Sequence, residues 1–303
     1  MGAKPRRIST ICRPRPHGDR FSATLEGMNS PARTVERVRR LGGTARVSDL
    51  IAAGTTDRVL ARAVDSGQLV RIKRGLVSLP DPDPAIRQAL VAGGLITCVS
   101  AVKEHGLWGV KDPELLHLWV PHGHPVAAER HRGVLAGRRL PGAYVPVLDA
   151  VLHALRCRPP LEALVIAESA VRLGRVTVAD LLGCLQGPRN GPVRDVVGRI
   201  GYDAESPLEI IARELFRQVG LRVETQVRIE GVGRVDLLVE GRLIVELDGF
   251  DFHWTRTEFR KDRRRNNAGV LSGLPTLRYI YEDLMFDADR VVAEVARMAR
   301  RTA

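Results

Sequence analysis

Apolar residues recur with helical spacing in the first part of the chain. Three short segments between residues 33 and 66 carry apolar side chains three or four positions apart. They are Val35, Val38 and Leu41 in the first segment, Val47, Leu50 and Ile51 in the second, and Val59, Leu60 and Val64 in the third. This spacing predicts three amphipathic helices that end near Gly42, Gly54 and Gly67, with Thr55 as the cap of the third.

Two short apolar runs follow at residues 69–72 and 76–79, separated by the turn Lys73-Arg74-Gly75. Three helices and a hairpin in this order predict a winged helix-turn-helix over residues 31–82. Five basic residues on the outer face of the third helix and on the hairpin are the predicted contacts to DNA grooves and phosphates: Arg58, Arg62, Arg71, Lys73 and Arg74. The alternatives are a protein-binding winged helix and arginines that only solvate a helix.

This segment resembles the N-terminal domain of AbiEi-type antitoxins and related transcriptional regulators. The resemblance covers about fifty residues and is carried by the hairpin sequence Gly67-Gln-Leu-Val-Arg-Ile-Lys-Arg-Gly75. It implies DNA as a partner and a toxin or another defence-system protein as a further candidate partner. A homodimer is a third candidate.

Residues 83–200 mix strand-like and helix-like patterns. Strands are predicted near residues 96–102 and 116–121, and helices over 147–155, 161–173 and 178–185. The mixture predicts a small α/β linker region, similar to the C-terminal part of AbiEi-like proteins. The Gly- and Pro-rich stretch at residues 186–192 is interpreted as a loop before the last domain.

Acidic residues cluster on a hairpin predicted for residues 235–248. The apolar alternation of residues 235–239, the turn Glu240-Gly241-Arg242 and the apolar run 243–245 would bring Asp236 opposite Glu246 and Asp248. Carboxylates this close repel unless a cation neutralises them, so the pattern indicates a Mg²⁺ or Mn²⁺ site. The alternative is an Asp-Gly turn beside an exposed strand-end glutamate.

Residues 205–303 resemble the very-short-patch-repair-like endonuclease domains of the restriction-endonuclease-like superfamily. The resemblance is carried in chain order by Ser206-Pro207-Leu208-Glu209, Val235-Asp236-Leu237, Val245-Glu246-Leu247-Asp248-Gly249, His253, Asp262-Arg-Arg-Arg265 and Thr276-Leu277-Arg278-Tyr279. It implies an α/β/α domain over residues 201–303. It also implies metal binding by Asp236 and Glu246 with help from Asp248. His253 or Lys261 would serve as proton acceptor or phosphate contact, and His253 ranks first because an imidazole titrates near neutral pH. The alternative for His253 is a surface or packing residue between Phe252 and Trp254. Asp248 stands where the superfamily often has lysine.

Three further features bear on this domain. Ser206, Pro207 and Glu209 fit an N-cap, a first helical residue and an N3 acid, although the resemblance also gives Glu209 a place at the metal site. Residues 256–267 are strongly basic, and Lys261, Arg265 and Arg278 are predicted phosphate contacts beside the acids. A solvated helix is the alternative for the basic run.

The excess of basic over acidic residues is concentrated near the N-terminus. The net charge is +12 over 303 residues, and residues 31–80 alone carry ten Lys and Arg against four Asp and Glu. The excess predicts affinity for a polyanion. Residues 1–30 hold several Arg and Pro without an apolar period and are predicted to be a disordered basic tail. No apolar run reaches the length of a membrane span, so no membrane partner and a cytoplasmic location are expected.

Cysteine and histidine residues are scattered along the chain. Cys12, Cys98, Cys157 and Cys184 form no Cys-x-x-Cys pair, so their spacing indicates free thiols rather than a zinc site or disulfides. His117, His122, His124 and His131 are interpreted as incidental loop histidines, with chelation by His122 and His124 as the alternative.

The sequence therefore predicts an α/β multi-domain chain with a winged helix-turn-helix, a middle α/β region and a restriction-endonuclease-like domain. Two function classes follow. The first is a metal-dependent DNA endonuclease, anchored by the winged helix, with a role in repair, phage defence or a toxin-antitoxin pair. The second is a non-catalytic AbiEi-like regulator or antitoxin that carries an inactive nuclease-like domain.

Overall fold

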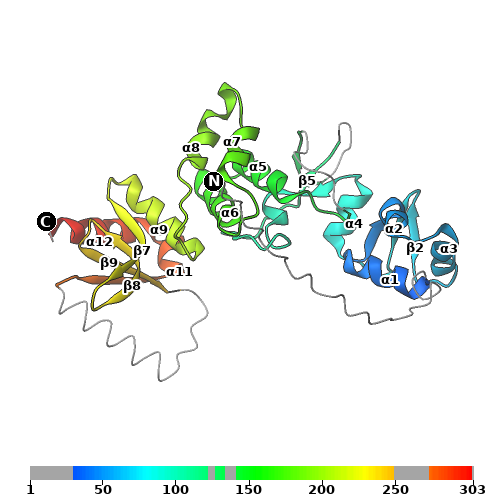
Figure 1. Cartoon of the computed structure of the whole chain (residues 1–303), viewed down its shortest axis with the longest axis horizontal. Helices are drawn as coiled ribbons and strands as arrows, with labels where there is room; N and C mark the ends of the chain where they lie inside the picture. Colours follow the sequence, from blue (N-terminus) through cyan, green and yellow to red (C-terminus); the bar gives the residue numbers. More distant parts are fainter. Residues whose placement is uncertain (1–29, 122–126, 134–140, 249–272, 302–303) are drawn as a thin grey trace, which may run out of the picture.

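The computed structural model of the chain describes residues 30–121, 127–133, 141–248 and 273–301. The elements fall into three parts that follow one another along the sequence, from blue through green to red in Figure 1. The predicted disordered tail, residues 1–30, lies outside the described residues apart from Ser30, which caps the first helix. Among the described residues, no helix is both long and apolar enough to cross a membrane.

The N-terminal part is a winged helix. Its elements are α1 (Pro31–Arg40), β1 (Thr44–Arg46), α2 (Val47–Ala52), α3 (Asp57–Asp65), β2 (Val70–Lys73) and β3 (Leu76–Ser78). The strands form an antiparallel sheet in the order β1-β3-β2. Val38, Leu50, Leu60 and Val77 lie in one core between the helices and the sheet, so the predicted winged helix is confirmed.

Three details of this part differ from the sequence prediction. Strand β1 was not predicted, because three residues are too few to show an alternation. The cap of α3 is Thr56, whose hydroxyl accepts from the Val59 N–H, while Thr55 is buried and accepts a hydrogen bond from Arg37. Ile51 is 41% exposed, since the two-turn helix α2 buries only Leu50.

The middle part shares a core with the winged helix. It begins with α4 (Pro84–Val91), β4 (Leu95–Ile96) and the short 3-10 helix η1 (Cys98–Ala101), followed by β5 (His117–Trp119) and β6 (Glu129–His131). β5 lies between β4 and β6, antiparallel to the first and parallel to the second. Leu76 of the hairpin packs with Ile86, Leu95 and Leu118 in one buried cluster.

The middle part ends in a bundle of helices: α5 (Val147–Cys157), α6 (Pro160–Arg172), α7 (Val178–Cys184), η2 (Pro188–Asn190) and α8 (Gly191–Val197). The predicted helices over 147–155, 161–173 and 178–185 are confirmed within two residues. The predicted strand at 96–102 is wrong beyond Ile96, because the chain turns there into η1. The loop predicted at 186–192 is wrong from residue 188 onward, where η2 and α8 begin.

Glycine is required where β1 approaches the segment before α4. Gly43 has a positive φ of 84°, and a Cβ there would lie 2.7 Å from the Pro82 Cα. We expect Gly43→Ala to lower the free energy of unfolding by about 1–3 kcal/mol more than Gly54→Ala, because backbone must move to admit the methyl group. Gly54 also has a positive φ, 90°, but its Cβ would meet nothing within 4 Å. Urea denaturation of both variants measures the difference, and equal losses of stability would contradict the prediction.

The C-terminal part is a four-stranded sheet covered by helices. Its elements are α9 (Pro207–Gln218), β7 (Val223–Ile229), β8 (Gly233–Val239), β9 (Leu243–Asp248), β10 (Thr276–Ile280), α11 (Tyr281–Phe286) and α12 (Ala288–Arg301). The strand order is β10-β9-β8-β7, with β10 parallel to β9 and the other pairs antiparallel. α9, α11 and α12 pack on one face of the sheet (Figure 1).

The predicted acidic hairpin is confirmed as a hairpin. β8 and β9 pair with Leu237 opposite Val245 and Val239 opposite Leu243. The turn is closed by the Arg242 N–H and the Val239 carbonyl at 3.1 Å. Glu240 and Gly241 have φ values of 52° and 68°, as a type I′ turn requires. The second helical layer implied by the endonuclease resemblance would come from residues 256–267, which lie outside the described residues.

Helix α9 joins the middle and C-terminal parts. Leu208, Ala212 and Phe216 lie in the core under the sheet, while Ile210 and Ile211 lie in the core of the middle helices. Arg213 on the same helix is fully buried and forms two hydrogen bonds with the Glu168 carboxylate of α6, at 2.9 and 2.8 Å. One helix therefore contributes to two cores, and a buried ion pair lies between them.

Candidate functional site

Exposed arginines mark the outer surface of the winged helix. One face of α3 is buried in the core through Val59, Leu60 and Ala63. Arg58 and Arg62, four positions apart, lie on the exposed side of this helix. Arg71 on β2 and Arg74 in the following turn are exposed as well. The structure thus places these four guanidinium groups where a polyanion can reach them.

Lys73 is exposed but already has a partner. Its ammonium group donates a hydrogen bond to the Val91 carbonyl at the end of α4, at 2.6 Å. The predicted phosphate contact at this residue therefore competes with a contact inside the protein. The candidate DNA surface is therefore defined without Lys73, by Arg58, Arg62, Arg71 and Arg74.

The acidic residues of the C-terminal sheet lie near one another. Asp236 on β8 accepts a hydrogen bond from the backbone N–H of Leu247 on β9, at 2.9 Å between Oδ2 and N. Leu247 packs into the core beneath the helices. Its neighbours Glu246 and Asp248 therefore face the opposite side of the sheet, because successive side chains of a strand alternate. All three carboxylates are half-buried.

Strand β10 brings a basic residue beside these acids. Arg278 is the register partner of Glu246, and Ile280 is the partner of Asp248. Paired residues of neighbouring strands point to the same face of a sheet. The strand register therefore places Arg278 next to Glu246, as predicted.

Ser206 is the predicted N-cap of α9, but the Glu209 carboxylate does not complete the predicted capping box, because it accepts from the Glu205 N–H and not from the Ser206 N–H. The Ser206 hydroxyl accepts a hydrogen bond from the Glu209 N–H, while the Glu209 carboxylate accepts from the Glu205 N–H and from the Gln226 side-chain amide, at 2.9 and 2.8 Å. Burial raises the pKa of Glu209, the Gln226 hydrogen bond opposes this, and the charge of Asp236 adds to the rise. The negative charge of Asp236 on the acidic hairpin thus contributes to the raised pKa of Glu209. The Glu209 carboxylate, however, already accepts hydrogen bonds from two donors.

Three members of the predicted site, His253, Lys261 and Arg265, lie outside the described residues. Within the described residues, one group of at least three potential metal ligands has all its ligand atoms within 4.8 Å of one another. This group lies in the middle part and does not include the acids of the hairpin. Two of these carboxylates with water ligands remain a suitable set for Mg²⁺, which keeps several waters in protein sites.

The interpretation of His117 and His131 as loop histidines is wrong. Both lie on paired strands, β5 and β6, and they face each other with 3.0 Å between ring nitrogens. Cys98 and Cys157 are free cysteines, and they join these two histidines in the compact group just described. The shortest separation between neighbouring members in the sequence is 14 residues, so no short spacing pattern could have revealed the group. His122 and His124 lie outside the described residues.

The core of three helices and a three-stranded sheet defines the N-terminal part as a winged helix domain. Residues 33–80 match the protein family described as "Transcriptional regulator, AbiEi antitoxin". This match agrees with the N-terminal resemblance drawn from the hairpin sequence. A search of curated proteins found no match to the chain.

Proposed function

We propose that this chain is a DNA-binding transcriptional regulator of the antitoxin type. The observation that supports the proposal is the set of four exposed arginines on α3 and the wing of a domain that matches the antitoxin family. In such a domain the third helix enters the major groove, so Arg58 and Arg62 would contact base edges or flanking phosphates. Arg71 and Arg74 would contact the phosphate backbone beside the groove.

The proposal is tested by selection from genomic DNA. Purified full-length protein is mixed with sheared DNA of its source organism, and the bound fragments are sequenced. A regulator is expected to enrich a small number of sites that share a short sequence. Bound fragments with the same distribution as the input would show that the protein does not recognise sequence.

Protein partners follow from the same proposal. The matched family is described as an antitoxin, so a toxin or another defence-system protein is the proposed partner of the middle or C-terminal part. A second copy of the chain is a further proposed partner, because a two-fold symmetric operator is bound by a dimer. Light scattering with and without a bound DNA duplex would give the number of chains in each complex.

A second candidate function is DNA cleavage by the C-terminal part. It is favoured by the hydrogen bond that brings Asp236 to β9 and by the register that puts Arg278 beside Glu246. Asp236 and Glu246 would hold Mg²⁺ or Mn²⁺, with Asp248 assisting. A cation held there would supply Lewis-acid activation of a water molecule. Attack of this water on phosphorus would break one P–O ester bond, and the sugar oxygen would leave as a hydroxyl group. His253 would accept the proton, and Lys261, Arg265 and Arg278 would hold the phosphate.

Plasmid cleavage tests the enzyme directly. Supercoiled plasmid is incubated with the protein and Mg²⁺ or Mn²⁺. We expect Asp236→Asn and Glu246→Gln to lower the rate by about 100-fold or more, because each removes charge that the cation requires. Glu224→Gln is the matched control, since Glu224 is an exposed carboxylate on β7 of the same sheet. Absence of cleavage by the wild-type protein would exclude the nuclease and leave the regulator proposal standing.

A further inference from the structure

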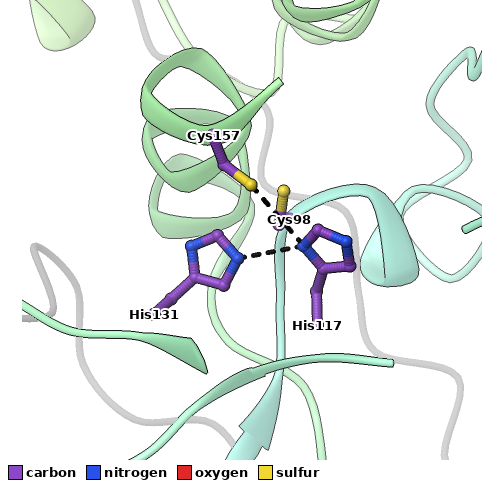
Figure 2. A group of neighbouring side chains, drawn as sticks. All are labelled: Cys98, His117, His131 and Cys157. Atoms are coloured by element: carbon purple, nitrogen blue, oxygen red, sulfur yellow. Dashed lines mark hydrogen bonds between the residues drawn. The ribbon is translucent and has the colours of Figure 1, made fainter. Parts of the chain in front are cut away.

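Four side chains from four separate segments of the middle part meet at one place (Figure 2). Cys98 begins η1, His117 begins β5, His131 ends β6 and Cys157 ends α5. Each offers a ligand atom, and these atoms all lie within 4.8 Å of one another. We propose that Cys98, His117, His131 and Cys157 bind one Zn²⁺ ion.

The distances suit a tetrahedral ion. His117 Nδ1 lies 3.0 Å from His131 Nε2 and 3.8 Å from Cys157 Sγ. Zinc bonds of about 2.0–2.1 Å to nitrogen and about 2.3 Å to sulfur place tetrahedral ligand atoms about 3.3–3.8 Å apart. The measured nitrogen–nitrogen separation is about 0.3 Å shorter than the tetrahedral value of about 3.3 Å, and the nitrogen–sulfur separation is about 0.3 Å longer than its value of about 3.5 Å. Small movements of the side chains would therefore complete the coordination.

The chemistry of the four groups also suits zinc. Two thiols and two imidazoles form a set common in structural zinc sites, and thiolate ligands favour Zn²⁺ over Mg²⁺. Burial, helped by the neighbouring histidines, lowers the pKa of His131 to about 3, and burial also lowers the pKa of His117. An imidazole ligand binds zinc through the lone pair of one ring nitrogen, and each of the two rings offers such a nitrogen to the group. Burial raises the pKa of both thiols, so zinc binding would release their protons.

The backbone and the neighbouring side chains hold the ligands in place. Cys98 has a φ of 53°, a left-handed conformation that is uncommon for residues other than glycine and is concentrated at functional sites. His153 packs its ring 5.0 Å from that of His131, and it is fixed by a 2.7 Å hydrogen bond between its Nδ1 and the Thr97 hydroxyl. The fixed His153 ring therefore restricts the orientation of the His131 ring by packing against it.

Zinc at this place would have a structural role. All four coordination positions would be filled by the protein, which is typical of structural rather than catalytic zinc. The ion would fasten the β5–β6 pair and η1 to the end of α5. A cleft of about 460 Å³, lined in part by His117, Glu129, Cys157 and Arg158, lies beside the group and gives the ion a route from solvent.

Metal content tests the proposal on the full-length protein. The protein is purified without chelator, and zinc is measured by mass spectrometry against protein concentration. We expect about one zinc per chain in the wild type and at least about tenfold less in Cys98→Ser and Cys157→Ser. Cys184→Ser is the matched control, because Cys184 is a half-buried free cysteine on α7 outside the group. It should retain the wild-type metal content.

A second measurement needs no variant. Wild-type protein is stripped of metal and titrated with Co²⁺, whose visible spectrum reports tetrahedral coordination and thiolate ligands. Alkylation is then compared with and without Zn²⁺, and the ion should protect Cys157 but not Cys184. The proposal is overturned if the wild type neither contains zinc nor takes up Co²⁺, if Cys98→Ser retains full metal content, or if the native protein has a Cys98–Cys157 disulfide.

Discussion

Replacing Glu168 with alanine is expected to lower the free energy of unfolding by about 3–5 kcal/mol, the usual cost of leaving one member of a buried ion pair alone. The side chains of Arg213 and Glu168 are 2% and 1% exposed, and the guanidinium group makes two hydrogen bonds with this carboxylate. Glu168 also accepts a hydrogen bond from the Gly201 N–H at 2.8 Å. Its removal would leave a buried cation with Glu214 as the remaining carboxylate partner among the described residues.

Urea denaturation followed by circular dichroism measures this destabilisation. The double variant with Glu168→Leu and Arg213→Met should recover part of the stability, because two apolar side chains need no ionic partner. Glu214 would keep Arg199 and Arg217, each at 3.4 Å. Glu36→Ala is the control, since it breaks exposed ion pairs of α1 and should change stability little. A Glu168→Ala variant as stable as this control would show that the pair does not hold α9 to the middle helices.

Replacing the four arginines of the winged helix is expected to weaken binding to duplex DNA by about 100-fold or more at moderate salt, because most of the affinity of such domains comes from phosphate contacts. The variant carries Arg58→Gln, Arg62→Gln, Arg71→Gln and Arg74→Gln. All four side chains are exposed, and the residues that build the core are unchanged. Fluorescence anisotropy with a labelled duplex measures the change.

A matched control separates this surface from net charge. Four exposed arginines elsewhere in the chain are changed to glutamine together: Arg175, Arg189, Arg228 and Arg297. This control removes the same amount of charge and should retain most of the affinity. Equal weakening in the two variants would show that DNA binding depends on the overall charge of the chain and not on α3 and the wing.

The parts of the fold that the sequence predicted are those encoded by local patterns. The helices of the winged helix follow from apolar spacing, and the acidic hairpin follows from alternation around the turn Glu240-Gly241. Register then determines which residues are neighbours across strands. Asp236 therefore lies near β9, as the local hairpin pattern indicates, whereas Arg278 lies beside Glu246 only through the parallel pairing of β10 with β9, which local sequence does not specify.

Features that depend on tertiary contacts were not predictable. The ligands of the proposed zinc site come from four segments, and only packing of α5 against η1 and the strands brings them together. The double role of α9 is hidden for the same reason, since Ile210 and Phe216 look alike as apolar residues but enter different cores. From the sequence alone, Arg213 would be assigned to a solvated helix face, because its partner Glu168 lies 45 residues earlier in the chain.

The salt dependence of DNA binding tests the central proposal most directly. The association constant of the full-length protein for one duplex is measured from about 50 to 200 mM salt, for the wild type and for the variant lacking Arg58, Arg62, Arg71 and Arg74. The wild type is predicted to show a steep linear fall of log K with log salt. The variant is predicted to show a slope smaller by about one unit for each phosphate that its side chains no longer neutralise. Identical slopes, or wild-type binding too weak to measure at the lowest salt, would contradict DNA binding by this winged helix.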